Sequence, residues 1–166
     1  MINATAALLI ILVGILQVTL AARITLLQAP ADLVLLFLVA WNMQENVKPE
    51  WRWALLGGLI LGLSSALPLW VVLSQYALVG LMTVYLRQRI WQIPILTLLT
   101  ATMLGTLIVD LISMVYLWLA TSPFNLMEAV NFIIIPRVVF NMLLALPAYA
   151  LISEISKLIL PEEIAS

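Results

Sequence analysis

The chain has 166 residues, of which 65% are hydrophobic and 9% are charged, and its formal net charge is −1. A mean hydropathy of +1.20 excludes a soluble globular domain, so we expect an all-α integral membrane protein with one transmembrane domain over residues 1–166. The sequence contains no Cys and no His, which excludes disulfides, thiolate and imidazole metal sites and the usual hydrolase nucleophile–base sets. We therefore expect no catalytic residue, no metal and no cofactor, and the absence of a basic stripe argues against nucleic acid as a partner.

The N-terminal apolar run, residues 4–22, predicts a first membrane crossing. The run is longer than the core of about 7 to 15 residues in a signal peptide, and no Lys or Arg precedes it, so we expect it to be retained. A short second crossing over residues 31–44 follows, with Asp32 at its start. Either the bilayer is thinned around this short crossing, or neighbouring helices shield it from lipid.

Residues 53–86 contain no charged side chain, and Pro68 divides them. A hydrocarbon core about 30 Å thick is crossed by about 20 helical residues, so one straight helix of this length would be too long. Because Pro68 lacks an N–H and disfavours helix in the residue before it, we expect two crossings, 53–66 and 69–86, joined by a turn. Small residues at four-residue spacing in the first of these predict a groove in which a helix of a partner protein docks. This glycine groove consists of Gly57, Gly58, Gly62 and Ala66.

Two further crossings and a surface tail complete the predicted six-helix bundle, whose crossings are short or broken by Pro. We expect the fifth crossing over residues 94–119 and the sixth over residues 132–152, with an aqueous connection between them. Residues 153–166 are predicted to lie as an amphipathic tail at the membrane surface.

Six crossings with a cytoplasmic N-terminus place most of the positive charge on one side of the membrane, as cytoplasmic loops require. Both termini are then cytoplasmic, and the basic residues inside are Lys48, Arg52, Arg87, Arg89 and Lys157. If residues 53–86 formed a single crossing, Arg87 and Arg89 would lie on the opposite side of the membrane from Lys48 and Arg52. The positive charge would then no longer be concentrated on the cytoplasmic side. The tryptophans are predicted to form two interfacial belts. The inner belt consists of Trp41, Trp51, Trp53 and Trp91, and the outer belt of Trp70 and Trp118.

Asp110 lies deep in the fifth crossing, where an ionisable side chain has a functional or pairing role by default. Arg137 lies at a comparable depth in the sixth crossing, and Asn141 follows it on the same helix face. We expect a buried ion pair between Asp110 and Arg137, with Asn141 completing its hydrogen bonding. In the alternative interpretation each charged side chain extends separately to the lipid headgroups. Neither interpretation makes an aspartyl protease, because Asp110 has no second deep carboxylate beside it.

Several stretches resemble, in their order and spacing, the family of the rod-shape-determining membrane protein MreD. They are residues 31–36, 53–63, 76–80 and 85–89 and, in the last crossing, Pro136, Asn141 and residues 145–149. The resemblance covers residues 31–155. The chain departs from the family at Ser64 and Ser65, near which the family commonly has an Asp, and at Leu67 and Pro68, where it commonly has a Leu-Gly pair. A role of that acid is therefore not carried over to this chain.

The resemblance implies a non-catalytic scaffold subunit of the bacterial elongasome, located in the cytoplasmic membrane and controlling cell shape and lateral peptidoglycan synthesis. It implies MreC as the direct partner and, through MreC, MreB, RodA and a class B penicillin-binding protein. It also implies a fold similar to the substrate-binding subunits of energy-coupling-factor vitamin transporters. A small-molecule (vitamin) binding subunit of a membrane transporter is therefore the alternative function, whereas the scaffold interpretation expects no small molecule.

Overall fold

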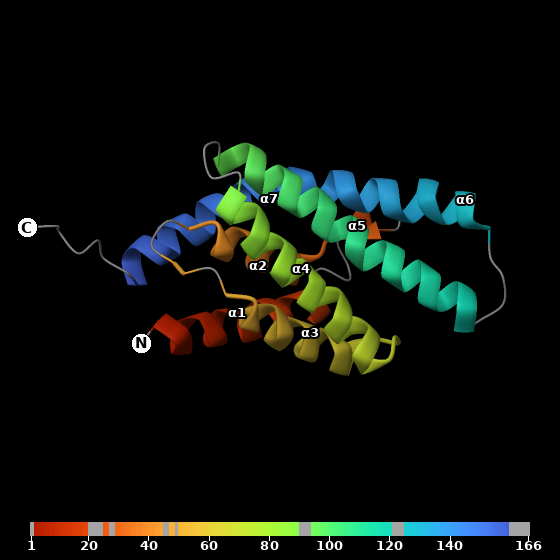
Figure 1. Ribbon diagram of the computed structural model, residues 1–166, viewed down its shortest axis with the longest axis horizontal. Coiled ribbons are helices and arrows are strands. Elements are labelled where there is room, and N and C mark those ends of the chain that lie inside the picture. Colours follow the sequence, from red (N-terminus) through yellow and green to blue (C-terminus); the bar gives the residue numbers. More distant parts are fainter. Residues whose placement is uncertain are drawn as a thin grey trace, which may run out of the picture.

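The computed structural model describes residues 2–19, 25–26, 29–44, 47–48, 50–89, 94–120 and 125–159. Within these residues the fold is all-α with six helices, accompanied by one short β-hairpin (Figure 1). The first five helices are α1 (Ile2–Thr19), α2 (Leu33–Asn42), α3 (Arg52–Ser64), α4 (Leu69–Arg89) and α5 (Pro94–Ala120). The last helix is continuous from α6 (Leu126–Ala129) through the π-helical turn η2 (Val130–Ile134) into α7 (Ile135–Ile159).

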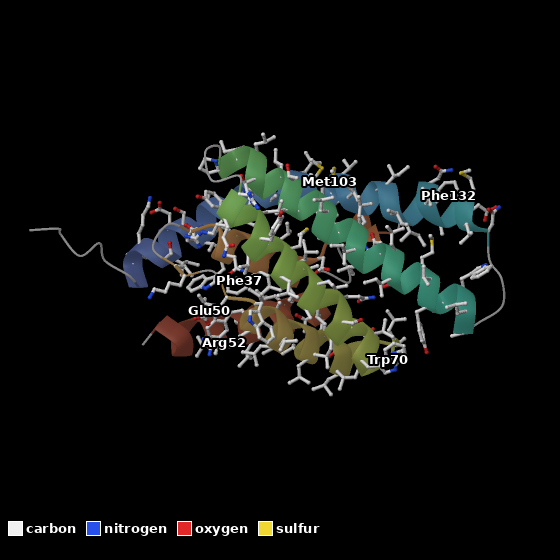
Figure 2. All side chains as sticks on the ribbon, viewed as in Figure 1. Phe37, Glu50, Arg52, Trp70, Met103 and Phe132 are labelled. Carbon is white, nitrogen blue, oxygen red and sulfur yellow. The ribbon has the colours of Figure 1, made fainter. Side chains whose placement is uncertain are left out.

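Successive helices run in opposite directions along the long axis of the molecule (Figure 1). The start of α1 and the end of α7 therefore lie at one end of the bundle, which we call the terminal end. The connection between α3 and α4 lies at the opposite end, which we call the hairpin end. In Figure 2, Glu50 and Arg52 lie toward the terminal end, whereas Trp70 and Phe132 lie toward the hairpin end. The start of α1 and the end of α7 lie at the same end because the helices make an even number of passes along the bundle.

The predicted turn at Pro68 is confirmed, since α3 ends at Ser64 and α4 begins at Leu69. The two helices pack antiparallel, because Gly62 near the end of α3 lies against Leu69, whereas Ala54 near the start of α3 lies against Gly80, farther along α4. Ser65 Oγ accepts a 3.0 Å hydrogen bond from the Leu67 N–H within the connection. The side-chain hydroxyl thus satisfies a backbone donor that the helix break would otherwise leave unpaired.

The centre of the bundle is α2, in which every residue from Val34 to Asn42 is buried. It is in contact with α1, α3, α4, α5 and α7, so the chain's own helices shield it. Of the two explanations for its shortness, shielding by neighbouring helices is therefore correct. Asp32 caps the helix, accepting a 3.0 Å hydrogen bond from the Leu35 N–H at Oδ1.

Among the described residues, three helices are long and apolar enough to cross a membrane: α4, α5 and the final helix over Leu126–Leu158. These candidate spans indicate a multi-pass membrane protein. The apolar segments Ala6–Thr19, Leu33–Asn42 and Arg52–Ser64 are shorter.

The last helix is longer at both ends than the sequence predicts. It begins at Leu126 rather than at residue 132, because Asn125 caps it by accepting hydrogen bonds from the N–H groups of Met127 and Glu128. It continues to Ile159, so the first part of the predicted surface tail extends α7. The rest of the predicted tail, residues 160–166, lies outside the described residues.

Two features near α2 also differ from the sequence prediction. Trp41 lies in the core rather than in an interfacial belt, stacked on Phe37 with ring centroids 5.7 Å apart. The segment between α1 and α2 contains an antiparallel β-hairpin, in which β1 (Thr25–Leu26) pairs with β2 (Ala29–Pro30). Burial of Trp41 depends on contacts between distant segments, whereas the β-hairpin pairs residues that are close in the sequence. Trp91 of the predicted inner belt lies outside the described residues.

Candidate functional site

A buried hydrogen-bond network joins the N-terminus of α2 to three other helices. Tyr76 of α4 donates its hydroxyl to Asp32 Oδ2 at 2.7 Å. The Asp32 backbone N–H donates to Asn141 Oδ1 of α7 at 2.9 Å, and Asn141 Nδ2 donates to Thr106 Oγ1 of α5 at 3.0 Å. All four residues are buried. Because a buried polar group that loses its partner is costly, this network fixes the relative positions of the four helices.

The structure brings together the two charged residues predicted to pair. Arg137 Nη1 lies 2.6 Å from Asp110 Oδ1, and Arg137 Nε donates to the Pro30 carbonyl at 3.2 Å. The guanidinium therefore faces the protein and the β-hairpin, rather than extending alone to the headgroups. The other carboxylate oxygen, Asp110 Oδ2, is buried and has no hydrogen-bond partner among the described residues.

Asn141 does not complete the hydrogen bonding of this ion pair, which corrects the prediction from the sequence. Asn141 lies one turn beyond Arg137 on α7, and Thr106 lies one turn before Asp110 on α5. Because α5 and α7 run antiparallel, the Arg137–Asp110 pair and the Asn141–Thr106 pair join the same two helix faces, one turn apart. The amide therefore meets Thr106 and the backbone of Asp32 instead of the carboxylate.

A cavity of about 300 Å³ lies beside this network at the hairpin end. Its apolar wall includes Leu61, Val72 and Val109. Two exposed residues at the end of α3, Ser64 and Ser65, border its mouth. Its principal polar side chains come from four helices and the α2 cap: Gln17, Asp32, Gln75, Tyr76, Ser113 and Arg137.

Of the two side-chain amides that line the cavity, one keeps an acceptor without a hydrogen bond from the described residues. Gln75 Nε2 donates to Ser113 Oγ at 2.9 Å, whereas Gln75 Oε1 accepts no hydrogen bond from the described part of the chain. Gln17 donates to the Ala31 carbonyl at 2.9 Å and accepts from the Leu33 N–H at 2.6 Å. The cavity is thus lined by a carboxylate, a guanidinium and one amide oxygen that the described residues leave free, a combination that can bind a small polar ligand.

The predicted glycine groove is occupied by the chain's own side chains, which corrects its assignment as a docking surface. A Cβ at Gly57 would lie 2.7 Å from Val34, one at Gly58 would lie 3.0 Å from Tyr76, and one at Gly62 would lie 2.5 Å from Leu69. The three glycines are buried, and only Ala66 is exposed. The small residues let α3 approach α2 and α4 closely, as in membrane helix pairs generally. They leave no space for a partner helix.

Sequence reasoning missed Asp32, Tyr76 and Gln75 as members of the site. A usable signal was present, because Gln75 and Tyr76 lie within the charge-free run from residue 53 to residue 86, and Asp32 opens a segment with no other charge. Which helices meet at Asp32 depends on the assembled bundle. In the described ranges no group of three or more Asp or Glu residues is placed to hold a metal ion.

Comparison with protein-family models, with curated proteins and with solved structures finds no match to this chain.

Proposed function

We propose that this chain is a non-catalytic membrane subunit of the bacterial cell-elongation machinery, as its resemblance to the MreD family implies. It crosses the cytoplasmic membrane six times with both termini inside. It binds MreC and, through MreC, communicates with MreB, RodA and a class B penicillin-binding protein during lateral peptidoglycan synthesis.

The observation that carries this proposal is the meeting of the resembling stretches at Asp32. Asp32 belongs to the stretch 31–36, Tyr76 to the stretch 76–80, and Asn141 to the pattern in the last crossing. The hydrogen bonds from Tyr76 and to Asn141 join all three stretches around one aspartate. Residues that carry the resemblance thus form one structural unit, which supports treating the resemblance as more than a coincidence of apolar sequence.

The distribution of charge supports the proposed orientation. Lys48 and Arg52 adjoin the start of α3, Arg87 and Arg89 end α4, and these segments meet at the terminal end. Arg87 donates 2.6 Å hydrogen bonds to the carbonyls of Asn42 and Val47, which ties the end of α4 to the loop after α2. Concentration of basic residues at one end is the pattern expected of a cytoplasmic face.

A scaffold of this kind acts by holding its outer faces in a fixed arrangement. The buried network around Asp32 and the close packing of α3 on α4 make the bundle rigid, so its surface is preformed for a partner. Because the glycine groove is filled internally, MreC contacts the outer faces of the helices.

The test is copurification of the tagged chain with MreC from mild detergent. We expect the two proteins to elute together by size exclusion. Asp32→Ala, which breaks the network at its centre, is expected to reduce coelution, whereas Glu154→Gln, which alters only an exposed carboxylate, is expected to preserve it. Elution of the intact wild-type chain without MreC would overturn the proposal.

A second candidate function, a small-molecule-binding subunit of a membrane transporter, is favoured by the polar cavity. A volume of about 300 Å³ is at the lower end of the range for ligand pockets, and its lining combines an apolar wall with a few polar groups. Tight binding of a vitamin, followed through tryptophan fluorescence, together with failure to copurify with MreC, would favour this candidate over the scaffold.

A further inference from the structure

We propose that the cavity at the hairpin end binds a small organic cation whose primary ammonium group contacts Asp32 and Gln75. This inference does not rest on the elongation function, and it concerns a site that the scaffold interpretation leaves without a role.

The charge of the cluster favours a cationic ligand. Asp32 and Asp110 are 3% and 5% exposed, and Arg137, whose side chain is 20% exposed, is the cation that pairs with Asp110. The formal charges of these three residues sum to −1. A buried net charge is unfavourable in a medium of low dielectric constant, and one positive charge in the adjoining cavity would neutralise it.

Asp32 keeps hydrogen-bonding capacity after its internal bonds are made. Its Oδ1 accepts from the Leu35 N–H and its Oδ2 accepts from the Tyr76 hydroxyl. Each carboxylate oxygen has two acceptor sites, so one remains on each oxygen. Gln75 Oε1 provides another acceptor in the same cavity, since its amide nitrogen is held by Ser113.

An ammonium group matches this set of acceptors because it carries three N–H donors and no acceptor. The Tyr76 hydroxyl donates toward Asp32, so its oxygen also presents lone pairs nearby. A carboxylate or phosphate in this position would instead face Asp32 with like charge. Ligand anions are therefore disfavoured despite the presence of Arg137.

The size and walls of the cavity limit the rest of the ligand. The cavity volume of about 300 Å³ is at the lower end of the range for ligand pockets, so the part of the ligand inside it is small. The apolar wall at Leu61, Val72 and Val109 suits a short hydrocarbon segment. Ser64 and Ser65 line the cavity and are exposed, so we place its mouth beside them.

A primary ammonium of this size has two sources in a bacterial membrane environment: a free amine or the headgroup of an aminophospholipid. The first experiment uses ethanolamine as the free amine, with ethylene glycol as the uncharged analogue, in calorimetric titrations of the purified chain in detergent. The second compares retention of phosphatidylethanolamine and phosphatidylglycerol on the same chain by native mass spectrometry. Binding in either arm supports the proposal and identifies the source, provided that the uncharged or anionic counterpart is rejected.

The decisive variant is Asp32→Asn, because Asn caps a helix about as well as Asp. The substitution removes the charge and replaces the oxygen that accepts from Tyr76 by an NH2 donor, which also suits a cation less well. We expect it to weaken ammonium binding by about thirtyfold or more, as expected for loss of one partner of a buried charge pair. Ser64→Trp obstructs the mouth and is expected to abolish binding while leaving the charge cluster intact. Glu154→Gln, the removal of an exposed carboxylate paired with Lys157, is expected to leave binding unchanged.

The proposal fails if ethylene glycol binds as well as ethanolamine, or if the intact chain binds neither ethanolamine nor phosphatidylethanolamine. It also fails if Asp32→Asn binds as tightly as the wild type. Should Asp32→Asn not fold, unchanged binding by Ser64→Trp would overturn the proposal, since the ligand would then lie elsewhere. Copurification with MreC is measured independently, so failure of one proposal is distinguishable from failure of the other.

Discussion

Tyr76 donates a 2.7 Å hydrogen bond from its hydroxyl to Asp32 Oδ2, joining the middle of α4 to the first turn of α2. Both side chains are buried. The same carboxylate caps α2, so one aspartate both begins the central helix and attaches it to a neighbour. The position of α2 therefore depends on this contact as well as on apolar packing.

Tyr76→Phe is expected to destabilise the fold by about 2 kcal/mol, because hydrogen bonds to charged groups contribute about 1.5–3 kcal/mol and Asp32 Oδ2 would lose its donor. The free energy of unfolding is measured by denaturant titration in detergent micelles. Tyr85→Phe is the matched control, since Tyr85 is 58% exposed and is expected to tolerate the change. Equal effects of the two variants would show that the buried hydroxyl contributes nothing specific.

Asp110→Asn is expected to destabilise the chain by about 3 kcal/mol, because it leaves the Arg137 guanidinium in a largely buried position without its counter-charge. Arg137→Gln should be costly for the reciprocal reason. In the double variant neither charge remains, so its destabilisation should be smaller than the sum of the two single effects. A double-mutant cycle of unfolding free energies measures this coupling. Additive effects would indicate that the two side chains act separately.

Gly80→Ala is expected to destabilise the chain by about 1–3 kcal/mol through overpacking of α3 against α4. A Cβ at Gly80 would lie 2.6 Å from Ala54 Cβ and 3.3 Å from the Trp51 carbonyl oxygen, and neither atom moves without its backbone. Thermal unfolding in detergent provides the measurement.

Gly105→Ala is the matched control for this prediction, because the nearest atom to its added Cβ is the mobile Leu35 Cδ1, at 3.3 Å. Replacement of a helical Gly by Ala otherwise favours the helix by about 0.5–1 kcal/mol, so Gly105→Ala should be neutral or stabilising. The prediction is wrong if the two variants unfold at the same temperature.

The features that could be predicted from the sequence have strong local causes. The charge-free run from residue 53 to residue 86 is too long for one crossing, and Pro68 indicates where it divides. The pairing of Asp110 with Arg137 was predictable because deep ionisable residues are rare, and each therefore has few candidate partners. Small residues at four-residue spacing likewise indicated close helix packing, although not which helix fills the space.

The features that were missed depend on the register between distant segments. Asn141 follows Arg137 on one face of α7, but its partner is determined by how α5 crosses that face. Burial of Trp41 follows from enclosure of α2 by five other helices, which no local pattern reports. The early start of the last helix is different, because Asn125 and Glu128 have the spacing of an N-terminal cap and the signal was available.

Single-cysteine labelling provides the test of the proposed topology, and the natural sequence suits it because it contains no Cys. We expect Lys48→Cys and Arg89→Cys to react with a membrane-impermeant maleimide only after the membrane is opened, since basic segments stay on the cytoplasmic side. Ser65→Cys, in the connection between α3 and α4, should react in intact cells. All three positions are exposed in the structure, so a difference in labelling reports the side of the membrane rather than burial in the protein. Labelling of Arg89→Cys from outside while Lys48→Cys stays protected would contradict the proposed membrane crossings on either side of Pro68, and labelling of both from outside would reverse the proposed orientation.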